Sequence, residues 1–310
     1  MQLTKNKNKK IIYLLGLGLI IYVLGLPSYS FAVKKPTSKL TVFVVNYPLK
    51  YFAERIAGEH ARVVFPAPKE VDPAFWMPDA ETIQKYQRAD LILLNGAHYA
   101  KWVQRVTLPQ FRLVNTSAAF KDRYIRADEM ITHTHGSEGE HSHEGILFTT
   151  WLDFDLATEH ARAIEKALSR KKPELSKVFG ANLESLERDL KNLDGEIKLL
   201  VSQKPSNLLV ASHPVYQYLA RRYGLNVVSL LWEPDKIPGD REWNKLRAIL
   251  RRHPARWMIW EGPANSTSID KLRSMGVNSL VFYPCANVPE KGDFLDVMRQ
   301  NIENLKKAFK

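Results

Sequence analysis

The chain has 310 residues, of which 45% are hydrophobic and 25% charged, and this composition excludes disorder over most of its length. Its net charge is +12, but the basic residues are scattered and interleaved with acidic ones, so we do not expect a nucleic acid as partner. Cys285 is the only cysteine, which excludes an intrachain disulfide framework. A chain of this length can bury one large core or two cores of medium size.

The first 32 residues have the order of segments that the export machinery recognises. Four lysines within residues 5–10 precede an uncharged apolar run from Ile11 to Leu26, and Ser30 and Ala32 offer small residues for cleavage. We expect residues 1–32 to be a cleaved signal peptide, which lowers the charge to +8 and leaves a soluble periplasmic protein. The alternative is a retained membrane anchor, although the apolar run is short for a hydrocarbon core of about 30 Å.

Residues 38–151 alternate short apolar runs with amphipathic ones and are expected to form an N-terminal α/β lobe. The apolar runs predict strands at residues 40–45, 62–65, 91–94 and 112–114. Helical periodicity predicts helices at residues 47–57, 79–88 and 99–106.

Residues 152–203 are predicted to be a helical region, in which Pro173 marks a break or a new helix start. Beyond Pro173, six apolar residues recur every three or four positions and therefore share one helix face. They are Leu183, Leu186, Leu190, Leu193, Ile197 and Leu200. We expect a stiff linking helix that allows only small lobe movements. The alternative is an ordinary core helix inside a single domain.

Residues 204–310 repeat the alternating pattern and are expected to form a C-terminal α/β lobe. Strands are predicted at residues 208–211, 227–231, 257–260 and 280–282, and helices at 215–223, 241–252 and 268–275. Alternation of this kind implies parallel sheets covered by helices. The expected fold class is thus α/β, with two lobes of parallel sheet flanked by helices and joined by a long rigid linking helix.

A histidine-rich segment, residues 132–145, interrupts the first lobe with the sequence THTHGSEGEHSHEG. It has no apolar residue to bury, so we expect a mobile loop. Neutral imidazoles are good ligands for zinc, copper and nickel, and the segment contains four: His133, His135, His141 and His143. The functional interpretation is metal capture or delivery. The alternative is a solvated polar loop whose histidines have no role.

His213 is a second candidate because it follows a predicted strand, and ligands of open α/β sheets collect at the carboxyl ends of strands. A single histidine can equally be structural. The surrounding run from His213 to Leu225 belongs, however, to a set of motifs that occur in one order along nearly all of the mature chain. The others are Asp72-Pro73 with Trp76 and Pro78, Ala89-Asp90-Leu91 before Asn95-Gly96, Trp151-Leu152-Asp153, and Asn301 to Leu305.

In these motifs and in its histidine-rich segment, the chain resembles the zinc and manganese solute-binding proteins of ABC transporters. The resemblance implies two lobes joined by a long helix. It also implies a divalent metal between the lobes, zinc before manganese or another metal, with no organic cofactor. The partner would be an ABC transporter permease in the inner membrane, and the protein would act as a monomer.

The four metal-ligand positions of that family are only partly matched. The histidine after the Asp-Pro pair is replaced by Ala74, and the histidine two residues before the Trp-Leu-Asp run by Thr149. His213 retains the third ligand, and Tyr283 is the best match for the fourth, an aspartate. One imidazole cannot form a closed zinc site, which needs four donors.

Three explanations remain open. In the first, a histidine of the mobile segment joins His213, and Cys285 or Glu261 completes the site; Glu261 can instead orient His213. In the second, a larger, more apolar and aromatic cleft binds a small organic ligand or a partner protein, unless the aromatic residues simply pack the lobes together. Its lining would be Ala74, Phe75, Trp76, Met77, Thr149, Thr150 and Tyr283.

The third explanation, an enzyme, lacks support. The sequence has no recognisable Ser-His-Asp arrangement, paired carboxylates or phosphate-binding loop, and Asp153 and Asp155 are expected to cap a helix. We therefore expect a solute-binding protein that captures a divalent metal for an ABC transporter at an altered interlobe site. The alternative is a binding or accessory protein with an organic ligand or partner in the cleft and only weak metal buffering by the histidine-rich segment.

Overall fold

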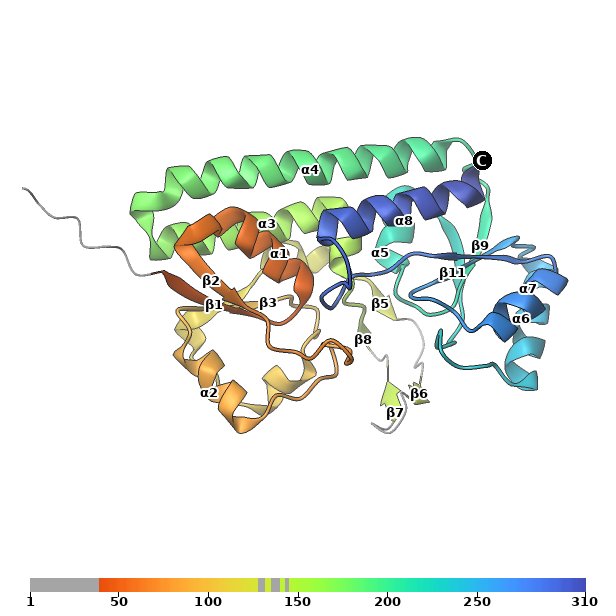
Figure 1. Cartoon of the computed structure of the whole chain (residues 1–310), viewed down its shortest axis with the longest axis horizontal. Helices are drawn as coiled ribbons and strands as arrows, with labels where there is room; N and C mark the ends of the chain where they lie inside the picture. Colours follow the sequence, from red (N-terminus) through yellow and green to blue (C-terminus); the bar gives the residue numbers. More distant parts are fainter. Residues whose placement is uncertain (1–38, 128–131, 135–139, 143–144) are drawn as a thin grey trace, which may run out of the picture. The chain divides into compact units, whose positions relative to one another are not determined.

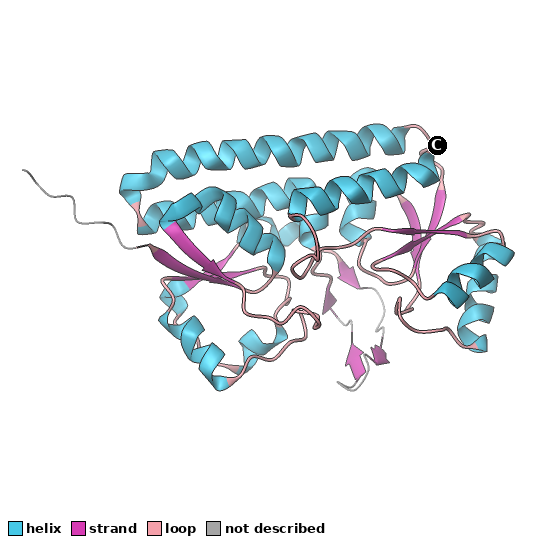
Figure 2. Ribbon diagram, in the orientation of Figure 1, coloured by secondary structure: helices cyan, strands magenta, loops and turns pink. Residues whose placement is uncertain are grey.

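In the computed structural model, which describes residues 39–127, 132–134, 140–142 and 145–310, two four-stranded parallel sheets form the framework. The expected signal peptide lies outside the described residues. Both sheets have the same strand order, in which the first strand along the chain lies between the second and the third: β2-β1-β3-β4 and β10-β9-β11-β12. Figures 1 and 2 show helices packed around each sheet, which confirms the predicted fold class.

The strands are short and largely apolar because helices cover both faces of a parallel sheet. The first sheet contains β1 (Leu40–Val44), β2 (Ala61–Val64), β3 (Leu91–Leu94) and β4 (Leu113–Asn115). The second sheet contains β9 (Leu208–Ala211), β10 (Asn226–Ser229), β11 (Trp257–Trp260) and β12 (Asn278–Val281). These positions agree closely with the apolar runs of the sequence.

The helices around the sheets begin at polar caps. Asn46, Asp79 and Asp293 each accept a backbone N–H in the first turn of α1, α2 and α8, respectively. The helices of the two lobes are α1 (Tyr47–Ala57), α2 (Ala80–Arg88), α5 (Gln217–Tyr223), α6 (Asp240–Arg252), α7 (Ser266–Ser274) and α8 (Phe294–Phe309). Short 3-10 helices are η1 (Gly58–His60), η3 (Gln110–Arg112), η4 (Ala118–Arg123), η6 (Thr150–Leu152) and η7 (Pro173–Leu175).

The α-helix predicted at residues 99–106 is wrong. That segment forms only a 3-10 helix, η2 (Lys101–Arg105). Gly96, Ala97 and His98 all have left-handed backbone conformations, with φ of 76°, 50° and 56°. These conformations cannot belong to a right-handed helix, so the helical segment starts late and has room for little more than one turn.

Two antiparallel helices connect the lobes, α3 (Phe154–Lys171) and α4 (Ser176–Ser202), with Pro173 starting a 3-10 turn between them. Figure 1 shows α4 running past both sheets, with α3 and α8 alongside it. Five of the six apolar residues predicted to share a helix face are buried in the core, and Leu183 packs against it. In the described part of the chain, no helix is long and apolar enough to cross a membrane.

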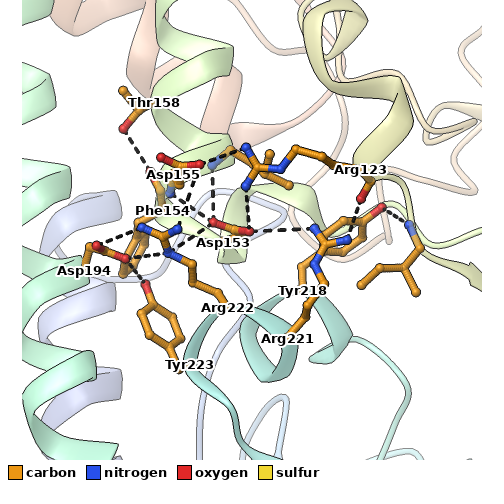
Figure 3. A network of polar contacts seen from close by, with 12 residues as sticks. Arg123, Asp153, Phe154, Asp155, Thr158, Asp194, Tyr218, Arg221, Arg222 and Tyr223 are labelled. Atoms are coloured by element: carbon orange, nitrogen blue, oxygen red, sulfur yellow. Dashed lines mark hydrogen bonds and ion pairs between the residues drawn. The ribbon is translucent and has the colours of Figure 1, made fainter.

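Asp153 and Asp194 join the helical layer to both lobes through arginines (Figure 3). Asp153 caps α3, as predicted, and its carboxylate lies 3.6 Å from the side chains of Arg123 in η4 and of Arg222 in α5. Asp194 of α4 accepts two hydrogen bonds from Arg222, at 2.9 and 3.0 Å, and one from Tyr223. This group, the Asp153–Arg222–Asp194 network, therefore connects the first lobe, both linking helices and the second lobe.

Two short strand pairs occupy the region predicted as a mobile loop. β5 (Arg126–Ala127) pairs with β8 (Gly145–Ile146), and β6 (Thr132–Thr134) pairs with β7 (Glu140–Ser142). The pairing of β6 and β7 places His133 and His141 at directly opposed backbone positions. His135 and His143 lie outside the described residues.

Burial of His160 predicts a specific dependence of stability on pH. This fully buried ring lies 2.7 Å from the Thr116 hydroxyl and 2.8 Å from the Thr150 hydroxyl. Because the Thr116 hydroxyl donates to Leu94 O, it accepts from His160 Nδ1, and in the neutral ring Nε2 accepts from the Thr150 hydroxyl. Burial lowers the pKa of His160 from 6.5 to about 3.

The unfolded chain therefore binds a proton at His160 between about pH 6.5 and pH 3, whereas the folded chain does not. Stability should fall with decreasing pH across this window, by up to about 1.4 kcal/mol per pH unit from this residue. We expect His160→Gln to flatten the pH dependence of the unfolding free energy between pH 6.5 and 5, measured by urea denaturation. The exposed-site control His98→Gln should keep the wild-type slope; an unchanged slope in His160→Gln would contradict the assignment.

The Asp153–Arg222–Asp194 network predicts a large effect for Arg222→Met. The substitution leaves two poorly exposed carboxylates without their shared guanidinium, so we expect a loss of about 2–3 kcal/mol in unfolding free energy. Arg299→Met is the matched control, because it removes only an exposed ion pair with Asp296 and should cost about 0.5 kcal/mol or less. Equal losses in the two variants would show that the network contributes no more than a surface pair.

Candidate functional site

The carboxyl ends of the two sheets border a cavity of about 290 Å³, called here the interlobe cavity. Its wall includes loops that follow strands of both lobes. Ligands of parallel sheets bind beyond the carboxyl ends of strands, above all where neighbouring strands connect in opposite directions. In the second sheet that position lies between β9 and β11, because β10 and β12 lie on either side of this pair.

His213 and Glu261 occupy this position of the second sheet. His213 comes two residues after β9, and Glu261 directly follows β11. The buried His213 ring has Nδ1 3.8 Å from Glu261 Oε1, which is an ion-pair distance rather than a hydrogen bond. The structure thus places Glu261 beside His213.

Two carboxylates that were not proposed as site residues from the sequence, Asp72 and Glu233, also line the cavity. Burial, followed by the negative charges of Glu233 and Asp72, raises the pKa of Glu261 from 4.5 to about 8. Asp72 and Glu233 could have been proposed as cavity residues from the sequence, since Glu233 lies in the loop after β10 and Asp72 in the loop after β2. The rule that ligands bind at carboxyl ends of strands applies to these loops as it does to His213.

Asp72 also shapes the turn that contains two sequence candidates. Its side chain accepts the N–H of Ala74 at 2.8 Å, and its backbone oxygen accepts the N–H groups of Phe75 and Trp76. Ala74 is fully buried and Trp76 half-buried, and neither belongs to the residues that line the cavity. Phe75, which belongs to the same turn, does line the cavity.

Tyr283 and Cys285 line the cavity from the loop after β12. Asn301 of α8 holds this loop, because its side chain accepts Tyr283 N–H and donates to Tyr283 O, both at 2.8 Å. Burial raises the pKa of Tyr283, and burial likewise raises the pKa of Cys285 well above its usual range. Both groups are therefore protonated at neutral pH, and the buried thiol is a poor metal ligand until it loses its proton.

Hydrogen bonds that run from one lobe to the other border the cavity. Trp151 donates its ring N–H to Pro284 O at 2.8 Å, and the Thr149 hydroxyl donates to Val215 O at 2.7 Å. The Asn287 side chain donates to Pro68 O at 2.6 Å and to Val71 O at 2.9 Å. The last contact fixes the loop that leads into Asp72.

Five of the sequence candidates thus meet at one cavity: His213, Thr149, Glu261, Tyr283 and Cys285. An imidazole with three carboxylates offers donors that divalent metals accept. Across the described ranges, however, no three side chains of His, Cys, Asp or Glu are grouped so as to hold a metal ion. The side chains of the four histidines in the histidine-rich segment fall outside the description.

Comparison with known proteins identifies relatives over nearly the whole described chain. The protein family described as zinc-uptake complex component A, periplasmic, matches residues 42–308. The zinc-binding lipoprotein AdcA of Streptococcus pneumoniae is 26% identical over 287 residues, which cover 89% of this chain and 57% of AdcA. The chain therefore spans little more than half the length of that relative.

Two further relatives match over their whole or nearly whole length. The manganese ABC transporter substrate-binding lipoprotein PsaA of Streptococcus pneumoniae is 26% identical, with 88% of this chain and 89% of PsaA covered. The crystal structure of the metal-dependent lipoprotein YcdH from Bacillus subtilis superposes with a TM-score of 0.74 and 23% identity, covering 87% of this chain and 99% of YcdH. At 23% identity, the similarity to YcdH supports the fold alone.

The contact of Asn287 with the Asp72 loop predicts a local effect. Asn287→Ala leaves the carbonyl oxygens of Pro68 and Val71 without this donor, so amide hydrogen exchange in residues 68–75 should accelerate at least several-fold. Asn182→Ala is the control, since it removes one bond to Ile56 O away from the cavity. Unchanged exchange in residues 68–75 of Asn287→Ala would show that other contacts hold the loop.

Proposed function

Because the chain belongs to the family of zinc-uptake complex component A periplasmic proteins, we propose that it captures a divalent metal, zinc before manganese, for an ABC uptake transporter. The observation that supports this most directly is the position of His213. Its imidazole lies beside Glu261 in a cavity where the carboxyl ends of both sheets meet. Binding with a small shift of the lobes, and no catalysis, is the activity we propose.

The proposed metal site is altered relative to the family. Ala74 and Thr149 stand where the resemblance places histidines, and the Thr149 hydroxyl already donates to Val215 O. Among the described residues that line the cavity, His213 is the one imidazole. We propose that the carboxylates Glu261, Asp72 and Glu233 supply negative charge that attracts the cation, and that His213 is the nitrogen donor.

The histidine-rich segment is proposed as a second, weaker site that collects metal for the cavity. His133, His135, His141 and His143 provide four imidazoles within eleven consecutive residues, 133–143. The pairing of β6 and β7 places the backbones of His133 and His141 opposite each other.

The cellular arrangement follows from the same proposal. Residues 1–32 would be a cleaved export signal, residues 38–151 and 204–310 the two lobes, and residues 152–203 the helical link. The relatives AdcA and PsaA are described as lipoproteins, and PsaA as a substrate-binding component of an ABC transporter. We propose a periplasmic monomer whose partner is the permease of the inner membrane.

A second candidate function has one observation in its favour. Aromatic side chains form much of the cavity wall, namely Phe75, Tyr99, Phe148, Trp151 and Tyr283. Pockets for small organic molecules are built in this way, with few polar groups among aromatic ones. In this version, the protein recognises an organic ligand or a partner protein, and the histidine-rich segment only buffers metal.

Calorimetric titration of the mature protein with Zn²⁺ tests the proposed function. We expect measurable binding that weakens at least ten-fold when residues 132–145 are deleted, because four imidazoles are lost. In the deletion variant, His213→Ala should abolish the binding that remains, whereas His253→Ala, at a histidine outside the cavity wall, should not.

The outcomes separate the alternatives. Absence of zinc binding at high micromolar concentration would eliminate metal capture and favour the second candidate. Unchanged residual affinity in His213→Ala would confine metal binding to the histidine-rich segment.

A further inference from the structure

The interlobe cavity is large for a bare metal ion. Its volume of about 290 Å³ corresponds to roughly ten water molecules at about 30 Å³ each. A zinc ion in a closed tetrahedral site is in direct contact with four donors, which leave little space around it. The cavity instead approaches the lower end of the range of about 300–1,000 Å³ found for sites of small organic molecules.

Across the described residues, no three side chains of His, Cys, Asp or Glu are grouped so as to hold an ion, so the residues of the cavity wall do not fill its coordination sphere by themselves. Tyr283 and Cys285 line the cavity, but burial raises the pKa of each and keeps it protonated. Thr149 uses its hydroxyl proton on Val215 O. His213 therefore offers one nitrogen donor to a metal ion in the cavity, beside carboxylates. Further neutral donors to that ion must come from a bound molecule.

Aromatic rings form a connected group on the first-lobe side of the cavity. The rings of Tyr99 and Phe148 meet edge to face at 5.2 Å between centroids, and those of Tyr99 and Trp151 at 5.6 Å. Phe75 packs edge to face on Phe148 at 6.3 Å. A planar ring gains favourable stacking or edge contacts from such a wall, whereas a hydrated ion gains none.

Tyr99 adds an independent sign of a ligand. Its side chain is 1% exposed, and its hydroxyl has no hydrogen-bond partner among the described residues. The hydroxyl interacts electrostatically with Asp72 and Tyr283, both of which line the cavity. Buried hydroxyl groups are nearly always hydrogen-bonded, so an acceptor on a bound molecule would satisfy this one.

The charge of the cavity wall selects the charge of that molecule. Among the described residues of the cavity wall, Glu70, Asp72 and Glu233 are acidic beside a single lysine, Lys69, and Glu261 adds a further carboxylate once it loses the proton that burial favours. A cationic ligand is attracted to such a wall and an anionic one is repelled.

We propose that the cargo of the interlobe cavity is a divalent metal already bound by a small aromatic chelator, carried as a cationic complex. His213 supplies one donor to the metal and the chelator supplies the others. Its ring contacts Tyr99, Phe148 and Trp151, and one of its oxygens accepts the Tyr99 O–H. This inference rests on the proposed function and names the chemical form of the metal that the cavity takes.

The test compares two chelators that present the same donors. Pyridine-2-carboxylate and glycine each bind Zn²⁺ through one nitrogen and one carboxylate, and each 1:1 complex has charge +1, but only the first contains an aromatic ring. The protein is the mature chain with His133, His135, His141 and His143 replaced by serine, so that the histidine-rich segment does not compete. Calorimetry measures the affinity for Zn²⁺ alone and for each complex.

We expect the pyridine-2-carboxylate complex to bind at least ten-fold more tightly than Zn²⁺ alone and several-fold more tightly than the glycine complex. Tyr99→Phe should weaken binding of the aromatic complex several-fold without changing the affinity for Zn²⁺ alone. His213→Ala should abolish binding of both complexes. Thermal unfolding of each variant verifies that it is folded.

Equal affinity for Zn²⁺ alone and for both complexes would overturn the inference and leave the proposed function intact. Tight binding of the aromatic complex that survives His213→Ala would also overturn it, since the metal would then not be the point of attachment. If the unaltered mature chain binds Zn²⁺ in no form, the proposed function itself fails.

Discussion

The guanidinium of Arg222 lies between two carboxylates that belong to different parts of the molecule. Asp153 sits at the start of α3, where the first lobe ends, and Asp194 lies in the middle of α4. Since Arg222 itself belongs to α5 of the second lobe, the three charges fix the second lobe against the helical layer. That placement brings the loops on either side of the interlobe cavity together.

With the lobes so placed, the loops after the strands of the two sheets meet. Trp151 and Thr149 of the first lobe donate hydrogen bonds to backbone oxygens of the second lobe. Asn287 of the second lobe donates one to a backbone oxygen of the first. Hydrogen bonds between loops of the two lobes therefore border the cavity. α8 reinforces it, because Asn301 holds the loop that carries Tyr283.

Burial of the side chains in the cavity wall also determines their protonation. Burial disfavours charge, so the phenol of Tyr283 and the thiol of Cys285 are kept protonated, and the pKa of Glu261 is raised towards neutrality. A cation that enters reverses this balance by stabilising the carboxylates. We therefore propose positively charged cargo for this cavity, even though Ala74 and Thr149 stand where the resemblance places histidines.

The sequence by itself determined the alternation of strands and helices, the buried stripe of α4 and the cap at Asp153, because these depend on neighbours within a few residues. It also identified His213 and Glu261 as cavity residues, since ligands bind after strand ends. The sequence did not reveal the short helix η2, which depends on left-handed residues at 96–98, or the roles of Asp72 and Glu233. Only the tertiary structure decided which candidates of the turn after Asp72 line the cavity: Phe75 does, whereas Ala74 and Trp76 do not, because hydrogen bonds such as those accepted by Asp72 set the course of this turn.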